Sequence, residues 1–225
     1  GFLAAITTRV ELVTGVVILP QRQTVLVAKQ AAEVDVLSGG RLRLGIGNGW
    51  NEVEYTGLNE NFKNRGARSA EQIELLRRLW TEREVTFRGQ YHTIPEAGLN
   101  PLPVQQPIPI WTGARAEVAL KRTARLADGW MPLGDMVDTE ERARAAVERL
   151  HGYLREASRD PQTFGIEPHL GLRRIPEDQW HAHADMWQRL GATRMCVSTM
   201  DLGYTSLAQH IDALPRAKDA LGLPA

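Results

Sequence analysis

The chain has a single cysteine, Cys196, among its 225 residues, so it cannot form a disulfide within itself. Cys196 lies in the apolar run Met195-Cys196-Val197, where a buried and unreactive thiol is the default expectation. No apolar run approaches the roughly 20 residues that cross a bilayer. No signal peptide is visible either, although the sequence opens at Gly1 without a Met. We therefore expect a cytoplasmic protein without a membrane partner.

The chain also lacks an excess of charge of either sign. Its 27 Lys and Arg residues balance 27 Asp and Glu residues, which gives a formal net charge of zero. Nothing in this balance favours nucleic acid as a partner, whereas a local basic pocket for a small phosphorylated ligand is compatible with it. With 43% hydrophobic and 24% charged residues, the composition predicts a single globular domain over residues 1–225.

Strand-like and helix-like segments alternate along the whole sequence. Apolar, β-branched runs predict strands over residues 10–19, 41–47, 108–112, 129–133, 164–172 and 194–198. Helical spacing predicts helices over residues 24–37, 69–80, 117–126, 139–157, 177–190 and 207–220, after the tail of a helix at residues 1–8. This alternation indicates an α/β fold with parallel strands. Six strands fit a (β/α)8 barrel without its first two strands, and a doubly wound open sheet is the structural rival.

Several residues mark the expected helix ends. Thr24 is a candidate cap for the first complete helix, and Ser69 and Gln72 have the spacing of a capping box. Pro176 and Gly191 suit the start and the end of the helix at residues 177–190. The segment between Asn51 and Asn64 is polar and rich in turn residues, and we expect no helix directly after Trp50.

The glycine-rich segment Gly45-Ile46-Gly47-Asn48-Gly49-Trp50 ends the second predicted strand. It resembles a dinucleotide fingerprint only loosely, because its glycines are spaced two by two and no ribose-binding acid follows at the expected distance. Small residues here would let a flat ligand lie against the strand end, within reach of Asn48. The alternative is a tight turn that needs glycine for its backbone geometry alone.

A second candidate site follows the third predicted strand, at Thr112-Gly113-Ala114-Arg115-Ala116. A helix is expected to start after Ala116, and the N–H groups at a helix start attract anions, to which Arg115 adds a positive charge. A phosphate-binding loop and an ordinary strand-to-helix turn with a solvated arginine are both compatible with this spacing.

No metal site is indicated by the sequence. His181 and His183 are two apart on a predicted helix, so they point to different faces, and we expect them at the surface or at an interface. Trp80, Trp180 and Trp187 occupy helix positions where burial is the default, whereas Trp50 and Trp111 adjoin strand ends. Arg22 lies just beyond the strand closed by Pro20, where it could reach a ligand or simply be solvated.

The order of several segments resembles the bacterial luciferase-like monooxygenase family, most closely the branch of coenzyme F420-dependent oxidoreductases. The segments are Thr14-Gly15-Val16, Leu19-Pro20, Ala28-Lys29, Leu37-Ser38-Gly39-Gly40-Arg41, Gly45-Ile46-Gly47-Asn48-Gly49-Trp50, Pro109-Ile110-Trp111-Thr112-Gly113-Ala114-Arg115, Ala127-Asp128-Gly129-Trp130-Met131-Pro132 and Leu190-Gly191-Ala192-Thr193-Arg194. The resemblance covers essentially the whole chain. It implies a (β/α)8 barrel that binds a reduced flavin or deazaflavin at the carboxyl ends of its strands.

The resemblance also assigns roles to individual residues. Gly15 and Val16 match a non-prolyl cis peptide that supports the back of the cofactor ring. Asn48 and Gly49, with Trp50 after them, match positions beside the polar edge of the ring or its ribityl chain. The residues that match the holder of the cofactor phosphate are Thr112, Gly113, Ala114, Arg115 and Ala116.

Two departures from the family pattern concern catalysis. Trp50 stands where relatives that oxidise sugar phosphates have a proton-donating glutamate, which argues against that substrate class. The first two strands of the family's barrel are absent from this sequence, and the loops after them carry the catalytic His or Trp of relatives. The catalytic residues of this chain are therefore not assigned, and the strand at residues 10–19 would have an unpaired edge.

The first functional hypothesis is an oxidoreductase that transfers a hydride between F420 and an organic substrate. An FMN-dependent monooxygenase is the alternative within the family. A basic rim at Lys63, Arg65 and Arg115 would favour F420 over FMN, because F420 has an acidic polyglutamyl tail. A further alternative is a non-catalytic paralogue that binds a cofactor or a sister subunit. A flavin-free barrel enzyme acting on a phosphorylated metabolite comes last, because no strand ends in a lysine or carboxylate suited to it. We also expect a homodimer.

Overall fold

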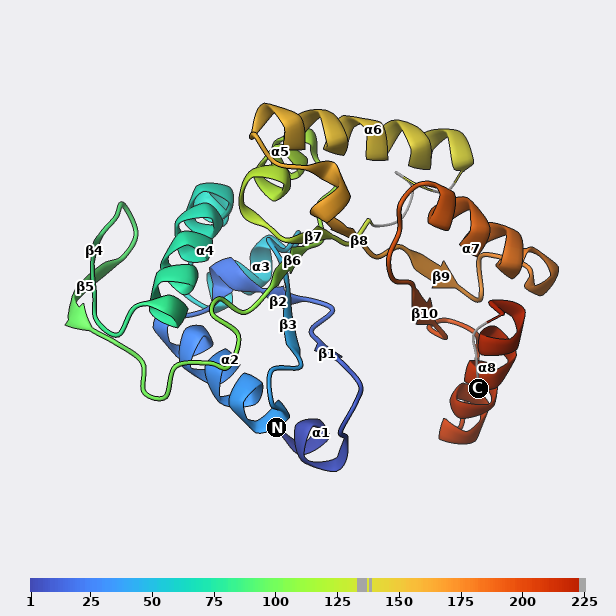
Figure 1. The fold of residues 1–225 in the computed structure, drawn as a ribbon, viewed down its shortest axis with the longest axis horizontal. Coiled ribbons are helices and arrows are strands. Elements are labelled where there is room, and N and C mark those ends of the chain that lie inside the picture. The colour runs from blue at the N-terminus through green and yellow to red at the C-terminus, as the bar shows by residue number, and fades with distance from the viewer. Residues whose placement is uncertain (133–136, 138, 223–225) are drawn as a thin grey trace. The chain divides into compact units, whose positions relative to one another are not determined.

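Short parallel strands form the centre of the first half of the chain in the computed structural model (Figure 1). The structure describes residues 1–132, 137 and 139–222. It divides into two compact units, Gly1–Asp128 and Gly129–Ala225, which we describe separately.

The first unit contains four of these parallel strands, several helices and one hairpin. In chain order its elements are α1 (Phe2–Ile6), β1 (Leu12–Val13), β2 (Val17–Ile18), the 3-10 turn η1 (Leu19–Gln21), α2 (Thr24–Ser38), β3 (Leu42–Gly47), α3 (Glu52–Gly57), η2 (Phe62–Asn64), α4 (Arg65–Thr81), β4 (Val85–Arg88), β5 (Thr93–Ala97), β6 (Ile110–Thr112) and α5 (Glu117–Leu126). Strand β3 pairs in parallel with β1 and β2 on one side and with β6 on the other. Strands β4 and β5 form an antiparallel hairpin.

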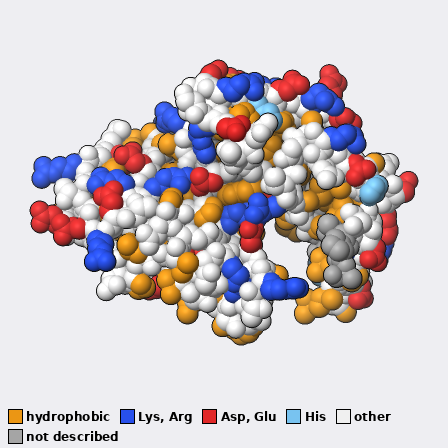
Figure 2. All heavy atoms as spheres, viewed as in Figure 1, with side chains coloured by type: hydrophobic (Ala, Val, Ile, Leu, Met, Phe, Trp, Pro, Cys, Tyr) orange, Lys and Arg blue, Asp and Glu red, His pale blue; other side chains and the backbone are white. Residues whose placement is uncertain are grey.

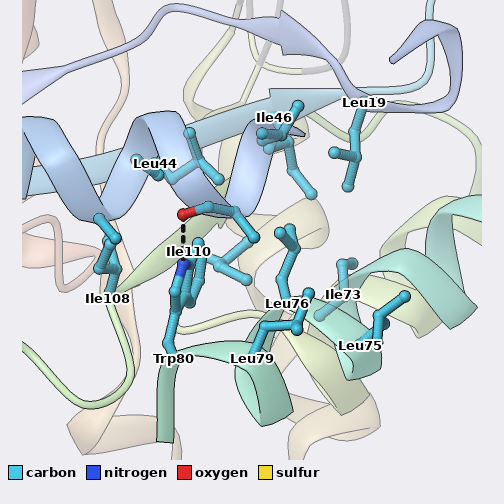
Figure 3. Close-up of a cluster of buried hydrophobic side chains, with 14 of the residues drawn as sticks. Leu19, Leu44, Ile46, Ile73, Leu75, Leu76, Leu79, Trp80, Ile108 and Ile110 are labelled. Carbon is cyan, nitrogen blue, oxygen red and sulfur yellow. Dashed lines mark hydrogen bonds between the residues drawn. The ribbon is translucent and has the colours of Figure 1, made fainter. Parts of the chain in front are cut away.

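The core of this unit lies where α2 and α4 pack against β3 and β6. Alternate residues of the strands, Leu44 and Ile46 in β3 and Ile110 in β6, point into it, as the period of two in a strand requires (Figure 3). Trp80 of α4 is fully buried here, and its indole N–H donates a hydrogen bond to the carbonyl of Ala28 over 3.0 Å. These contacts fix α2 and α4 against the strands that end at the candidate site.

The turn between α2 and β3 explains the motif Ser38-Gly39-Gly40-Arg41. Gly39 ends the helix in the left-handed conformation at φ 69°, and Gly40 follows at φ 83°. The guanidinium of Arg41 then donates hydrogen bonds to carbonyls of α1 and of the following turn, those of Ala4, Thr7 and Val10. The motif therefore ends a helix and ties α1 to the start of the sheet.

The predicted strand at residues 10–19 is wrong as one continuous element. It is divided into β1 and β2, because three residues separate Val13 from Val17 while only two separate their partners Arg43 and Ile46. One extra residue therefore lies opposite β3, which is the arrangement of a β-bulge. Thr14 bridges the interruption: its hydroxyl donates to the carbonyl of Gly45 over 2.8 Å and accepts from the N–H of Gly45 over 2.9 Å.

The second unit also consists of parallel strand pairs and helices. Its elements are β7 (Gly129–Trp130), α6 (Glu140–Glu156), η4 (Pro161–Thr163), β8 (Gly165–Ile166), β9 (His169–Gly171), η5 (Glu177–Gln179), α7 (Trp180–Arg189), β10 (Cys196–Ser198) and α8 (Leu207–Ala220). Strand β7 pairs with β8, and β9 pairs with β10, both in parallel. The strand predicted over residues 164–172 is thus two strands, β8 and β9. Leu133, the last residue of the predicted strand 129–133, lies outside the described residues.

Two helix-start predictions are wrong. The cap of α2 is Gln23, and Thr24 is already helical and buried. Helix α4 begins at Arg65, four residues before Ser69, so Ser69 and Gln72 lie on its buried face and form no capping box. Gln72 is buried because its side chain has other partners: its amide group donates hydrogen bonds to the hydroxyl of Thr24 over 2.9 Å and to the carbonyls of Leu19 and Arg22. The expected end of α7 is confirmed, with Gly191 at φ 90° after the helix.

Candidate functional site at the carboxyl ends of the strands

The predicted cofactor residues lie at or just after the ends of β3 and β6, except Gly15 and Val16, which lie between β1 and β2. Ile18 of β2 pairs with Gly47 of β3, and Ile46 of β3 pairs with Thr112 of β6. The carboxyl ends of β2, β3 and β6 therefore lie at one edge of the sheet, where ligands of α/β folds gather. The loops that leave this edge contain most of the residues that the sequence singled out.

The Gly15–Val16 peptide bond is cis, which confirms the geometry expected at this position. No atom of the described residues lies within 4 Å of the position that a Gly15 Cβ would take. The side chain of Val16 instead points to β3, where its Cγ2 lies 2.8 Å from the position of a Cβ on Gly47. Only glycine at residue 47 leaves room for this approach, so the bulge and the end of β3 fit together.

The turn Asn48-Gly49-Trp50 is held from both sides. Gly49 has φ 67°, and a Cβ there would lie 2.9 Å from Cγ2 of Ile18. The hydroxyl of Tyr55 donates to the carbonyl of Asn48, and the Tyr55 ring lies edge-on to Phe62 at 5.3 Å. Trp50 is 86% exposed. The turn therefore presents Trp50 to solvent on a well-supported backbone.

A helix follows this turn, contrary to the sequence prediction. Helix α3 begins at Glu52, and the side chain of Asn51 caps it by accepting a hydrogen bond from the N–H of Val53 over 3.3 Å. The Asn51 cap was the available signal in the sequence, since asparagine is a preferred N-cap residue. Through Tyr55, α3 positions Asn48, and sequence reasoning missed this supporting role.

The loop after β6 places its five predicted residues in different surroundings. The Thr112 hydroxyl lies 2.6 Å from the hydroxyl of Thr123 and joins β6 to α5, so it points away from the edge. Gly113 donates its N–H to the carbonyl of Ile46 over 3.0 Å, and Ala114 is buried. Arg115 and Ala116 are exposed, and no side chain caps Ala116, the N-cap of α5. An anion at this loop would thus contact the start of α5 and Arg115.

The two tryptophans that adjoin strand ends differ in their exposure to solvent. Trp111 is buried beneath the guanidinium of Arg43, whose Cζ lies 4.3 Å from the ring centroid. Arg43 also lies 3.6 Å from the carboxylate of Glu11. Trp111 therefore belongs to the packing of β3 against β6, while Trp50 is accessible. Trp80, Trp180 and Trp187 are buried, as predicted.

The remaining sequence candidates are Arg22 of the first unit and two histidines of the second unit. The side chain of Arg22 is exposed, and its carbonyl accepts the hydrogen bond from Gln72. His181 is exposed, with its Nε2 3.3 Å from the Asp185 carboxylate. His183 is half-buried, and burial lowers its pKa, although a hydrogen bond to the backbone of His169 acts in the opposite direction. The surface position expected for His183 is therefore only partly correct.

The arrangement at this edge can hold a flat ligand with an anionic group. The space beside Gly15 is open, and the start of α5 offers backbone N–H groups and the side chain of Arg115 to an anion. Within the part of the chain that the structure describes, no cluster of three or more His, Cys, Asp or Glu residues could hold a metal ion. No described helix is long and apolar enough to cross a membrane.

Residues 1–219 match the model of the luciferase-like monooxygenase family. The chain belongs to this family. The match includes all the segments whose order resembled the family, and the α/β fold with parallel strands agrees with the predicted class.

Proteins similar to this member of the luciferase-like family include both F420- and FMN-dependent enzymes. An uncharacterised protein of Mycobacterium tuberculosis is 43% identical over 149 residues, which are 66% of this chain and 51% of the relative. The F420-dependent glucose-6-phosphate dehydrogenase of Amycolatopsis mediterranei is 37% identical over 56% of this chain and 38% of its own. The FMNH2-dependent dimethylsulfone monooxygenase of Pseudomonas fluorescens is 31% identical over 60% of this chain and 38% of its own. The chain thus spans about half the length of the first of these relatives.

Solved structures of the family agree with the fold. Monooxygenase RslO1 from Streptomyces bottropensis matches 97% of this chain and 59% of its own with a TM-score of 0.67 and 26% identity. The coenzyme F420-dependent tetrahydromethanopterin reductase from Methanopyrus kandleri matches 100% of this chain and 70% of its own, with a TM-score of 0.66 and 18% identity. The second likeness concerns the fold alone.

Proposed function

We propose that this chain forms the cofactor-binding part of an oxidoreductase that transfers a hydride between coenzyme F420 and an organic substrate. The observation on which the proposal rests is the open edge formed by the carboxyl ends of β2, β3 and β6. The glycine turn after β3 and the start of α5 lie along it, and the cis peptide at Gly15–Val16 lies just before β2, where the side chain of Val16 reaches Gly47. Family members of both cofactor types make this the first function to test.

The residues at this edge fit a deazaflavin or flavin. Gly15 and Val16 would support the back of the ring, since the space beside Gly15 is open. Asn48, Gly49 and Trp50 would lie beside the polar edge of the ring or its ribityl chain. Ala114, Arg115 and Ala116 would hold the phosphate, with Thr112 and Gly113 fixing that loop to the sheet. The bound cofactor would supply hydride chemistry, while the protein orients the ring and excludes water.

An FMN-dependent monooxygenase is the second candidate, favoured by the similarity to the dimethylsulfone monooxygenase. The edge at the carboxyl ends of β2, β3 and β6 suits the ring of F420 and that of FMN alike, so it does not distinguish the two cofactors. A chain that binds a cofactor without catalysis is the third, because the described residues supply no clear acid–base pair at the edge. Trp50 in place of a glutamate makes a sugar-phosphate substrate the least favoured class under any of these functions.

The first test is a fluorescence titration of the chain with F420 and, in parallel, with FMN. We expect saturable binding of F420 that Arg115→Glu abolishes, because the substitution would repel the cofactor phosphate. Lys121→Glu is the matched control: it reverses the same charge one turn into α5, on an exposed side chain that pairs with Glu117. This variant should bind like the parent chain.

The outcomes distinguish the candidates. Preference for FMN would move the assignment to the flavin-dependent branch, and an equal loss in both charge variants would contradict the phosphate loop at Arg115. Binding of F420 without hydride exchange would favour the non-catalytic alternative. If neither cofactor binds to this chain or to a longer form of the protein, the proposed function is wrong.

A further inference from the structure

The second unit contains a cavity of about 310 Å³ that is lined by apolar side chains and by arginines. It lies between the turn after β9, the start of α7, the loop after β10 and the middle of α8. Its wall includes Leu172, Trp180 and Ala213, whose side chains are buried. In Figure 2, hydrophobic side chains gather over the region of α8, with charged ones beside them. Small-molecule sites are typically cavities of about 300–1,000 Å³ with apolar walls and a few polar groups.

The buried side chains of this wall offer apolar surface to a ligand. The indole N–H of Trp180 donates a hydrogen bond to the carbonyl of Ile175 over 2.8 Å, so the polar atom of this ring is already engaged. Ile175, Leu202 and Tyr204 also line the cavity and pack against the hydrophobic cluster of this unit. A ring that entered the cavity would therefore exchange water for hydrocarbon and aromatic surface.

Three exposed arginines form the rim of the cavity, and two of them are paired with a carboxylate. Arg216 of α8 donates hydrogen bonds from Nε and Nη2 to the carboxylate of Glu177, the first over 3.2 Å. Arg173 lies 3.8 Å from the carboxylate of Asp201. Arg174 forms no ion pair with a carboxylate in the described part of the chain. These five side chains together carry one positive charge in excess.

The hydroxyl of Tyr204 is a second polar group that a ligand could reach from this cavity. It has no hydrogen-bond partner among the described residues, and the Tyr204 ring lies edge-on to His210 at 5.2 Å. Tyr204 is also close enough to Arg216 for the two side chains to interact electrostatically. A hydroxyl donor and an unpaired guanidinium beside one apolar wall are groups that suit a carboxylate attached to an apolar body.

We propose that this cavity binds an aromatic monocarboxylate. Its ring would lie against Trp180, and its carboxylate would accept hydrogen bonds from Arg174 and Tyr204. The single excess charge suits a monoanion, because the carboxylates of Glu177 and Asp201 would repel a phosphate dianion at the same place. None of these residues belongs to the candidate cofactor site, so the proposal does not depend on the proposed function.

The probe is 2-naphthoate, titrated into the chain by isothermal calorimetry and compared with 2-naphthylmethanol and with acetate. We expect saturable binding of 2-naphthoate that is about tenfold tighter than binding of the alcohol, because the alcohol lacks the charge that Arg174 would pair with. Acetate should bind about a hundredfold more weakly than 2-naphthoate, because it lacks the ring that the apolar wall would bury.

Two substitutions at the rim test where the probe binds. Arg174→Gln should weaken binding of 2-naphthoate by about fivefold and leave that of the alcohol unchanged. Because Arg174 is exposed, this variant should fold. Tyr204→Phe keeps the ring and removes the hydroxyl, so it should weaken binding by about threefold. Arg189→Gln is the matched control: Arg189 is an exposed arginine in the last turn of α7 that does not line the cavity, and its loss should not change the affinity.

Four results would overturn the proposal. Absence of saturable binding of 2-naphthoate is the first, and equal affinity for the acid and the alcohol is the second, since it would make the cavity a purely apolar site. Third, an equal loss in Arg174→Gln and Arg189→Gln would indicate unspecific attraction of anions to the chain. Fourth, binding that neither Arg174→Gln nor Tyr204→Phe weakens would place the probe elsewhere on the molecule.

Discussion

At the scale of single residues, glycine positions set the geometry of the candidate edge. Gly47 admits Val16, and Gly49 admits Ile18 while adopting a left-handed φ of 67°. A side chain at Gly49 meets two penalties at once, a close contact with a β-branched neighbour and an unfavourable backbone conformation. Gly57, eight residues later at the end of α3, meets neither, since no described atom lies within 4 Å of its Cβ position.

We therefore expect Gly49→Ala to lower the free energy of unfolding by about 1–3 kcal/mol. Gly57→Ala should leave it unchanged or raise it slightly, because alanine is the better helix residue. Urea unfolding followed by circular dichroism measures both. Equal stability of the two variants would contradict the steric account of the turn, and any loss of cofactor binding in Gly49→Ala should exceed that in Gly57→Ala.

At the scale of elements, one carboxylate of α4 holds the turn of the β4–β5 hairpin. Glu71 accepts hydrogen bonds from the N–H groups of Gln90 and Tyr91 and from Nδ1 of His92. The other ring nitrogen of His92 lies 2.7 Å from the hydroxyl of Thr24, which links the hairpin to α2 as well. Burial raises the pKa of Glu71, but the hydrogen bonds from His92, Tyr91 and Gln90 outweigh it and hold this pKa below its ordinary value.

Because the pKa of Glu71 is lower in the folded state, its ionised form stabilises the fold above the ordinary pKa of a glutamate. This contribution is lost as the pH falls through the lowered value. Glu71→Gln should cost about 1–3 kcal/mol at neutral pH, since the bonds to a charged acceptor are replaced by weaker ones. The difference from the parent chain should shrink in acid. Unfolding free energies measured across this pH range test it.

Glu74→Gln provides the control for this pH dependence, because Glu74 lies one turn along α4 and lines the same cavity as Glu71. Its difference from the parent chain should stay small at every pH. A cost of Glu71→Gln that is the same in acid as at neutral pH would show that the loss comes from packing and not from the charged hydrogen bonds.

At the scale of the whole molecule, apolar side chains of the first unit are accessible. On α1, Phe2 is 77% exposed, and Leu3 and Ile6 are also exposed. Strands β1 and β2 pair only with β3 among the described residues, which leaves one edge of the sheet open there. Exposed apolar surface beside an open strand edge favours association. The homodimer expected from the sequence is consistent with this surface and stays a prediction.

We expect sedimentation velocity of the chain to show a dimer that Leu3→Lys weakens, because a charge would have to be buried in the contact. Leu37→Lys is the matched control on α2, where the side chain is 65% exposed. A monomer at all concentrations would contradict the prediction. A dimer weakened only by Leu37→Lys would assign the contact to α2.

The sequence by itself determined the alternation of strands and helices, the family and the residues at the strand ends. Apolar periodicity depends on which side of each element is buried, so it placed α2, α5, α6 and α8 close to their observed bounds. The resemblance added the cis bond at Gly15–Val16, which no periodicity contains. The Ser69–Gln72 spacing failed because a capping pattern is local, whereas burial of Gln72 depends on η1 and α2 packing against it.

Only the tertiary structure decided which of these residues meet. At the bulge between β1 and β2 the side chain of Val16 reaches Gly47, and the guanidinium of Arg122 in α5 reaches the backbone of Gly66 in α4. Residues 66 and 122 are distant in sequence, and each alone has the pattern of an ordinary surface position. Contacts of this kind form when helices pack on a shared sheet, so their charges and close approaches become visible only in the folded chain.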